Sequence, residues 1–355
     1  MKRALALLLL LVCIVLLFVL NLLLGTVRIP FATVVDILVH PAMGRLFGMG
    51  HPLEGTMQWE IWYNIIWNSR VPQALTALVA GAGLAVSGLQ MQTVFRNPLA
   101  GPSVLGISNG ASLGVACVVL LSGSLGGVAL SRLGYIGDVA ISIAAIVGAL
   151  AVMGLILWIA TKVRSSVTLL IIGVMIGYLA TAIIGVLKFF SAEEDIRAYV
   201  VWGLGSFARV SGDQMMLFVI LMCILLPLSM LTVKAMNLYM LGDAYASNLG
   251  LNVRRTRLLL IVCSGTLVAI VTAYCGPVMF IGLAVPHLAR AIFRTSDHRM
   301  LMPATMLAGA ALALLCNLIA RMPGFEGALP VNSITALVGA PIIASVLFRR
   351  RKSEG

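Results

Sequence analysis

The sequence predicts an all-α integral membrane protein with ten transmembrane helices and both termini in the cytoplasm. Of its 355 residues, 61% are apolar even before the 35 glycines are counted, and only 10% are charged. A soluble chain has roughly 45–50% apolar residues with glycine included, and about 25% charged residues. Ten apolar stretches approach the roughly 20 residues that a helix needs to cross a bilayer, and basic residues gather in alternate loops. This composition excludes a soluble enzyme, a disordered chain and a nucleic-acid-binding protein, despite the net charge of +12.

The ten stretches follow one another with short connections. They lie near residues 4–24, 71–94, 103–122, 138–160, 166–188, 214–233, 257–275, 277–293, 300–320 and 332–348. The first is too long for a signal peptide and no small-x-small cleavage site follows it, so we expect a retained span. The runs are continuous rather than alternating, which excludes a transmembrane barrel. We therefore expect a single transmembrane domain over residues 1–355.

The distribution of charge sets the orientation of these spans. With a cytoplasmic N-terminus, 16 of the 24 Lys and Arg residues fall in cytoplasmic segments. Nine of the 12 acidic residues fall outside. The positive-inside rule therefore supports ten spans with both termini in the cytoplasm. The same rule explains the basic composition without an anionic partner.

Ionisable residues are scarce inside the spans. The stretches 4–24, 71–94, 103–122 and 214–233 contain none. Proton- and ion-coupled carriers usually place carboxylates or histidines deep in the membrane, so an ion- or proton-coupled secondary transporter is the weaker alternative. A polytopic membrane enzyme would need a convergent polar site, which the sequence does not display.

The sequence also lacks features of a chain that binds its own energy source or metal. No G-x-x-x-x-G-K-[ST] phosphate loop occurs, so ATP-driven transport would need a separate subunit. The four histidines have no metal-ligand spacing, and none of the six cysteines forms a C-x-x-C pair. We expect neither a metal site nor a cofactor in this chain.

Two cytoplasmic loops contain distinctive residues. The first, after the second span, contains Asn97-Pro98 and Gly101-Pro102, which favour turns; an ordinary helical hairpin explains it adequately. In the second, residues 234–257, Asp243 is expected to cap a short helix that Gly250 ends in a left-handed conformation. Leu241, Tyr245 and Leu249 are expected to form an apolar stripe on this helix. Such a stripe is expected to be covered, either by a partner protein or by the membrane surface.

Six segments in this order resemble one family. They are Arg70-Val71-Pro72-Gln73 through Ser87-Gly88; Arg96 to Pro102 with Leu105-Gly106; Leu241-Gly242-Asp243 with Leu249-Gly250; Phe280 to Leu283 with Pro286-His287; Asp297-His298-Arg299; and Leu329-Pro330 with Thr335-Ala336 and Gly339-Ala340-Pro341. Over about residues 60–348 the chain resembles the permease subunit of the iron-chelate and vitamin B12 class of ABC importers. One departure is Gln73, where the family often has a second arginine.

The resemblance implies a non-catalytic homodimer in the cell inner membrane. Two separate cytoplasmic ATPases would bind ATP and Mg²⁺, and a soluble periplasmic binding protein would deliver the substrate. That substrate would be a large metal chelate: an iron–siderophore complex, heme or cobalamin.

The resemblance also assigns roles to residues. ATPase coupling is expected at Leu241, Gly242, Asp243, Tyr245, Leu249 and Gly250. Docking of the binding protein is expected at Arg70 and Arg321, for which the residues alone allow an interfacial anchor instead. An inner gate is expected at Asn97, Leu99, Ser165 and Ser166, with Leu99 as an apolar plug and the other three holding the loops by hydrogen bonds.

Overall fold

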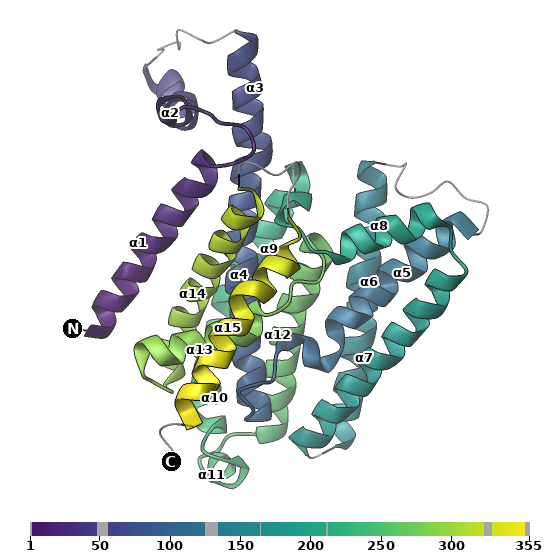
Figure 1. Ribbon diagram of the computed structural model, residues 1–355. Coiled ribbons are helices and arrows are strands. Elements are labelled where there is room, and N and C mark those ends of the chain that lie inside the picture. Colours follow the sequence, from purple (N-terminus) through teal and green to yellow (C-terminus); the bar gives the residue numbers. More distant parts are fainter. Residues whose placement is uncertain are drawn as a thin grey trace.

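The computed structural model describes residues 2–47, 56–124, 134–163, 165–210, 212–322 and 329–351. Within these ranges every regular element is a helix (Figure 1). Six charged residues that enter the predicted charge distribution lie outside the described residues: Glu54, Arg132, Arg164, Glu326, Lys352 and Glu354.

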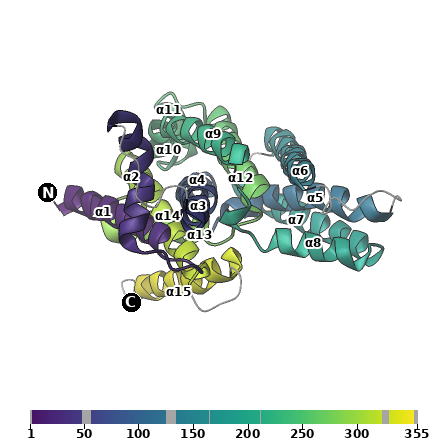
Figure 2. The same ribbon diagram turned by 90° about the horizontal axis from the view of Figure 1, so that it is seen from above.

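One long helix passes through the middle of the molecule (Figure 2). It comprises α3 (Met57–Ile65), the π-turn η1 (Ile66–Arg70) and α4 (Val71–Phe95) without a break, 39 residues in all. Pro72 explains the widened turn, because proline has no N–H to donate and its ring clashes with the carbonyl four residues earlier. The N–H of Val71 instead donates to the carbonyl of Ile66, five residues back.

Small residues let other helices approach α4 closely. Around it pack α9 (Gly212–Met230), α12 (Val253–Cys275), α13 (Ile281–Phe293) and α14 (His298–Ala320). A Cβ atom added to Gly88 would lie 1.7 Å from the carbonyl oxygen of Gly282, and one added to Gly81 would lie 2.4 Å from that of Gly309. Backbones this close are typical of helix packing in membranes.

A second group of helices lies to one side (Figure 2). It contains α5 (Ile107–Ser124), α6 (Tyr135–Lys162), α7 (Ser166–Phe189) and α8 (Glu193–Gly203). A Cβ added to Gly114 would lie 3.2 Å from the Cα of Gly148, and one added to Gly106 would lie 3.1 Å from the carbonyl oxygen of Gly173. Glycines thus allow these helices to approach one another closely.

The remaining helices complete the bundle and extend beyond it. At the opposite edge, α1 (Lys2–Leu23) packs on α14, where Asn21 Nδ2 donates to the carbonyl of Leu314 at 3.0 Å. The last helix is α15 (Val331–Arg351). Both α2 (Phe31–Phe47) and α3 project beyond the end of the bundle (Figure 1).

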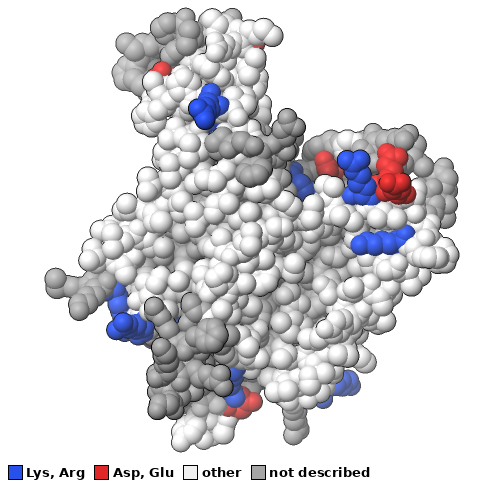
Figure 3. Space-filling view, viewed as in Figure 1, with Lys and Arg blue, Asp and Glu red and all other residues white. Residues whose placement is uncertain are grey.

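Each predicted apolar stretch contains a described helix or part of one. Six are long and apolar enough to cross a membrane: Arg3–Leu23, Met57–Phe95, Ile136–Lys162, Ser166–Phe189, Val253–Cys275 and His298–Ala320. Three shorter apolar helices cover Ile107–Leu121, Ile281–Phe293 and Val331–Ala344. The surface between the ends of the bundle is almost free of charge in the view of Figure 3.

Three predicted stretches are interrupted where the sequence suggested continuous helices. Stretch 103–122 begins as the 3₁₀ turn η2 (Pro102–Leu105), and Gly106, with φ of +73°, separates it from α5. Stretch 214–233 bends by 46° between Met230 and Val233. Stretch 277–293 is helical only from Ile281 onward. A helix at α2, α3 or α8 was not predicted.

Candidate coupling segment, inner gate and outer docking site

The short helix predicted within residues 234–257 is present. It follows α10 (Val233–Tyr239) and runs from Asp243 to Asn248 as α11. Gly250 has a φ of +83°, the left-handed conformation expected just beyond the helix. Leu241, Tyr245 and Leu249 are 55%, 71% and 60% exposed. These three large apolar side chains, of which only Tyr245 lies within α11, are thus more than half exposed in the described part of the chain.

Asp243 does not cap α11 as predicted. The N-cap residue is Gly242, which makes no side-chain capping bond, and Asp243 is the first helical residue. Its carboxylate instead accepts a hydrogen bond from Arg96 Nη2, from the end of α4. An acidic residue in the first turn still interacts favourably with the helix dipole.

The loop after α4 is held by short, specific hydrogen bonds. Asn97 Oδ1 accepts from the N–H of Leu99 at 2.9 Å. The carbonyl of Asn97 accepts from the N–H of Ala100 at 3.0 Å. His287 Nε2, on α13, lies 2.7 Å from the carbonyl oxygen of Pro98. The loop is thus a defined turn attached to a neighbouring helix.

Leu99 faces a cavity as well as solvent. The cavity encloses about 610 Å³ of empty space, part of it open to solvent. Its apolar lining includes Leu84, Leu99, Val268, Met279 and Phe280. Leu99 thus occupies a position from which its side chain can obstruct an apolar space between helices.

Phe280 was part of a recognised sequence segment, but no role was predicted for it. Its φ of +68° is uncommon for a bulky residue and places strain immediately before α13. Its side chain packs against α15, since a Cβ added to Gly339 would lie 2.9 Å from the Cβ of Phe280. No local sequence signal distinguishes such a residue from an ordinary apolar one.

The serines of the second predicted gate loop begin a helix. Ser165 Oγ accepts a hydrogen bond from the N–H of Thr168 at 3.3 Å and so caps the N-terminus of α7. Ser166 is the first residue of α7. Neither serine lines the cavity that Leu99 faces. Within one chain, only the first of the two predicted gate loops therefore lines this cavity.

Arg70 is buried, contrary to the expectation that it reaches an outer surface. Its side chain is 0% exposed, and Nη1 donates to the carbonyls of Leu22 at 2.6 Å and Leu23 at 2.9 Å. Nη2 donates to the carbonyl of Val27. These carbonyls belong to the end of α1 and the chain beyond it, where backbone acceptors lack helical partners. Arg70 therefore holds α1 against the central helix.

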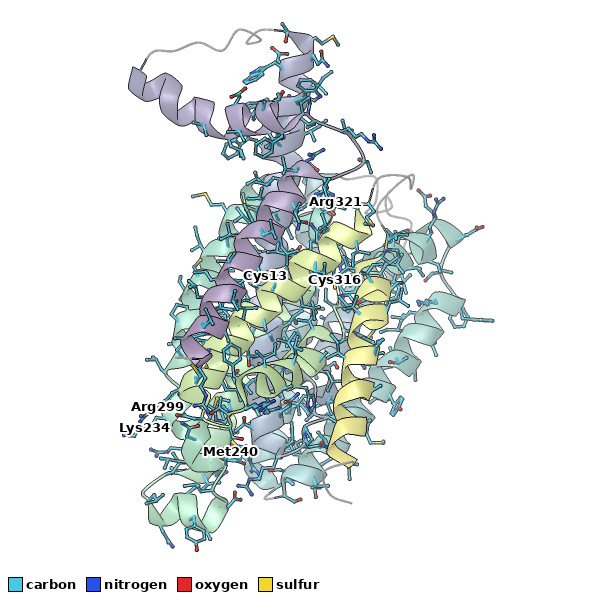
Figure 4. All side chains as sticks on the ribbon, turned by 60° about the vertical axis from the view of Figure 1, so that its left-hand side comes forward. Cys13, Lys234, Met240, Arg299, Cys316 and Arg321 are labelled. Carbon is cyan, nitrogen blue, oxygen red and sulfur yellow. The ribbon has the colours of Figure 1, made fainter. Side chains whose placement is uncertain are left out.

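Arg321 lies beside Arg70 and is partly exposed. A Cβ added to Gly25 would lie 3.3 Å from Nη2 of Arg70 and 3.4 Å from Nη2 of Arg321. Two guanidinium groups thus converge on one glycine. Nη1 of Arg321 has no hydrogen-bond partner in the described part of the chain. Figure 4 shows Arg321 at the opposite end of the bundle from Lys234 and Arg299.

Asp297 joins α10 to the start of α14. It caps α14 by accepting from the N–H of Arg299 at 2.9 Å, and it also accepts from Asn237 Nδ2 at 2.6 Å. These two hydrogen bonds, the one from Arg299 first, hold the pKa of Asp297 below its usual range. The carboxylate therefore stays charged at neutral pH and ties the two helices together.

Comparison with known proteins gives consistent results along the chain. Residues 11–349 match the model of the FecCD transport family. The vitamin B12 import system permease protein BtuC of Klebsiella pneumoniae subsp. pneumoniae is 37% identical over 286 residues, covering 81% of this chain and 83% of the relative. BtuC of Citrobacter koseri is 37% identical over 288 residues, covering 81% of this chain and 84% of the relative.

A solved structure also shares the fold. It is assigned to the metal-chelate type of ABC transporter in an inward-facing conformation, and it matches with a TM-score of 0.78 and 26% identity. The match covers 98% of this chain and 99% of that one. Together these matches confirm the resemblance drawn from the six segments and a transport role without catalysis by this subunit. The chain belongs to the FecCD transport family and is a multi-pass permease subunit of an ABC importer.

Proposed function

We propose that this chain forms the translocation path for a large metal chelate, which is an iron–siderophore complex, heme or cobalamin. Two copies form the membrane channel, two cytoplasmic ATPases drive it with ATP and Mg²⁺, and a periplasmic binding protein delivers the chelate. The family match over residues 11–349 carries this proposal. The vitamin B12 relatives and the metal-chelate structure support the substrate class.

The proposed topology has ten spans with both termini in the cytoplasm. We count as spans the six long helices, the three shorter apolar helices and the bent pair α9–α10, ten in all. Arg3 Nη2 donates to the carbonyl of Arg294 at 3.3 Å, which places the start of α1 beside the loop before α14. α15 ends at the same end of the bundle at which α11 lies (Figure 1). The positive-inside rule assigns this end to the cytoplasm.

The ATPase is proposed to bind the exposed stripe of Leu241, Tyr245 and Leu249. An amphipathic helix commonly inserts its apolar face into a groove on a partner. Gly242 and Gly250 bracket α11 with positive φ values, so the chain turns sharply on either side of it. This geometry supports a protruding coupling element rather than a helix lying flat on lipid.

The binding protein is proposed to dock at Arg321, with Arg70 in a supporting role. Arg321 is partly exposed just beyond the end of α14, although its nitrogen Nη1, which has no partner among the described residues, is itself buried. Arg70 is fully buried, yet its positive charge lies beside Arg321 at Gly25. A carboxylate approaching Arg321 would meet the field of both guanidinium groups, which favours acidic residues on the partner.

The inner gate is proposed to involve Asn97, Leu99, Ser165 and Ser166. Leu99 supplies an apolar obstruction at the mouth of the cavity, and Asn97 fixes its backbone. Ser165 and Ser166 start α7 at the inner end of the bundle, where a second copy would bring a symmetrical pair. The support for this gate is the position of Leu99.

Reconstitution tests the proposed function and its substrate. The permease and its ATPase are placed in liposomes, and ATP hydrolysis is measured with binding protein loaded in turn with ferric siderophore, heme or cobalamin. One loaded form should stimulate hydrolysis and accumulate its chelate inside the liposomes. Chelate accumulation without the ATPase, driven by an ion gradient, would instead establish the secondary-transporter alternative.

The coupling stripe has its own variant and control. Leu249→Asp places a carboxylate in the proposed apolar contact and should release the ATPase or uncouple hydrolysis from transport. Ser247→Asp adds the same charge to α11 on the opposite side of the helix, where it should leave ATPase binding intact. Equal ATPase binding and transport by both variants would contradict docking through this stripe.

A further inference from the structure

Arg96 lies at the junction between the coupling segment and the loop proposed as inner gate. It follows the last residue of α4 and precedes Asn97 directly. With φ of +46° it adopts the left-handed conformation that ends many helices, although glycine usually occupies that position. A residue with a long side chain is less stable than glycine in this conformation, so the contacts of the Arg96 side chain must offset that cost.

The guanidinium group of Arg96 contacts both sides of the turn between α10 and α11. Nη2 donates to the carbonyl of Tyr239 at 3.1 Å, at the last residue of α10. The guanidinium carbon lies 5.1 Å from the centre of the Tyr239 ring, within the range of a cation–π contact. Nη2 also donates to the Asp243 carboxylate at the first residue of α11. Arg96 therefore contacts the turn at three points.

The other side of the loop is attached to α13. His287 Nε2 lies 2.7 Å from the carbonyl oxygen of Pro98. One turn earlier on α4, Gln92 Nε2 donates to the carbonyl of Leu283 at 3.2 Å, and Arg290 Nη1 donates to Gln92 Oε1 at 2.5 Å. The loop thus lies between a fixed attachment to α13 and the Arg96 attachment to the coupling segment.

From this arrangement we propose that Arg96 is a positioning residue that transmits displacement of the coupling segment to the Asn97–Leu99 loop. When the ATPase moves α11, the turn at Tyr239 and Asp243 pulls on Arg96, and the backbone of Asn97 moves with it. Because His287 holds the far side of the loop, the movement changes where Leu99 points instead of translating the whole loop. This inference rests on the proposed docking of the ATPase at α11.

Hydrogen exchange of the assembled permease–ATPase complex tests the two ideas separately. In the unmodified complex, ATPase binding should protect amides of residues 241–249, and addition of ATP should change exchange in residues 97–101. Arg96→Met retains an aliphatic side chain but removes the guanidinium group. It should retain protection at 241–249, lose the change at 97–101, and reduce chelate transported per ATP hydrolysed at least fivefold.

A matched control and a charge reversal complete the test. Arg255→Met removes an exposed arginine from the start of α12 and should retain both exchange changes and transport. Arg96→Glu should impair coupling as Arg96→Met does, and adding Asp243→Arg to it should recover at least half of the lost transport per ATP. The role of Arg96 would be overturned if Arg96→Met transported as much chelate per ATP as the unmodified complex. It would also be overturned if the double variant transported no more chelate per ATP than Arg96→Glu. Absent protection at 241–249 in the unmodified complex would refute docking at α11, and this inference with it.

Discussion

Replacing Arg70 should destabilise the fold rather than merely weaken docking of a partner. Arg70→Met removes the guanidinium group but retains an unbranched apolar side chain. The two bonds to Leu22 and Leu23 have lengths of 2.6 and 2.9 Å and involve a fully buried donor group. Hydrogen bonds to charged groups contribute about 1.5–3 kcal/mol each, so their loss should cost at least ~3 kcal/mol. The bond to Val27 adds less, because that residue is exposed and its carbonyl can regain water.

The assay compares Arg70→Met with Arg321→Met in the solubilised permease. The free energy of unfolding and amide exchange along α1 are measured for both. Arg321 is partly exposed and one of its nitrogens has no hydrogen-bond partner among the described residues, so its replacement should cost less than ~1 kcal/mol. Arg70→Met should be the less stable variant and should exchange faster at the C-terminal end of α1. Equal stability of the two variants, with binding-protein association lost only in Arg70→Met, would refute the assignment made from burial.

Three further predictions concern topology, packing and the gate. Single cysteines at Ser247 and Ala192 should react with an impermeant thiol reagent from opposite sides of the membrane, and labelling from one side would reject the ten-span topology. Gly88→Val should prevent assembly of the α4–α13 contact, since even a Cβ would lie 1.7 Å from a backbone oxygen; a stably folded variant would show that the two helices can separate. Cysteines at Leu99 should crosslink between the two copies with a yield that depends on ATP, and no crosslink in any nucleotide state of an active dimer would place this loop away from the axis.

The sequence predicted the long helices well because their signal is local. A run of about 20 apolar residues has few alternatives to a helix in a membrane protein. The interruption at Gly106 was missed because apolar composition is the same in a 3₁₀ turn and in an α-helix. The helices α2 and α3 were missed because, at 17 and 9 residues, each is shorter than the roughly 20 apolar residues that a predicted span requires.

The site residues show a clearer limit to sequence reasoning. Asp243 fits a helix cap by the local rule, but its partner, Arg96, is 147 residues away. Arg70 looked like a surface residue because it stands at the end of an apolar run, while its acceptors are backbone carbonyls of another helix. Backbone acceptors have no residue type, so no sequence pattern can reveal them. By contrast, Gly250 and the exposed stripe of α11 depend on nearest neighbours and were predicted.

The central helix α4 connects Arg70 at one end of the bundle with Arg96 at the other, so rotation of the helix would move both residues. Arg70 and Arg96 lie 26 residues apart on it, a distance of about 39 Å along the axis at 1.5 Å per residue. At about 100° per residue their side chains leave the axis in directions that differ by roughly 80°. The π-turn ends at Arg70, so the residues between the two arginines form continuous α-helix. If that stretch turns about its axis, Arg70 and Arg96 turn by the same angle. The contact of Arg70 with the end of α1 and the orientation of the Asn97–Leu99 loop would therefore change together.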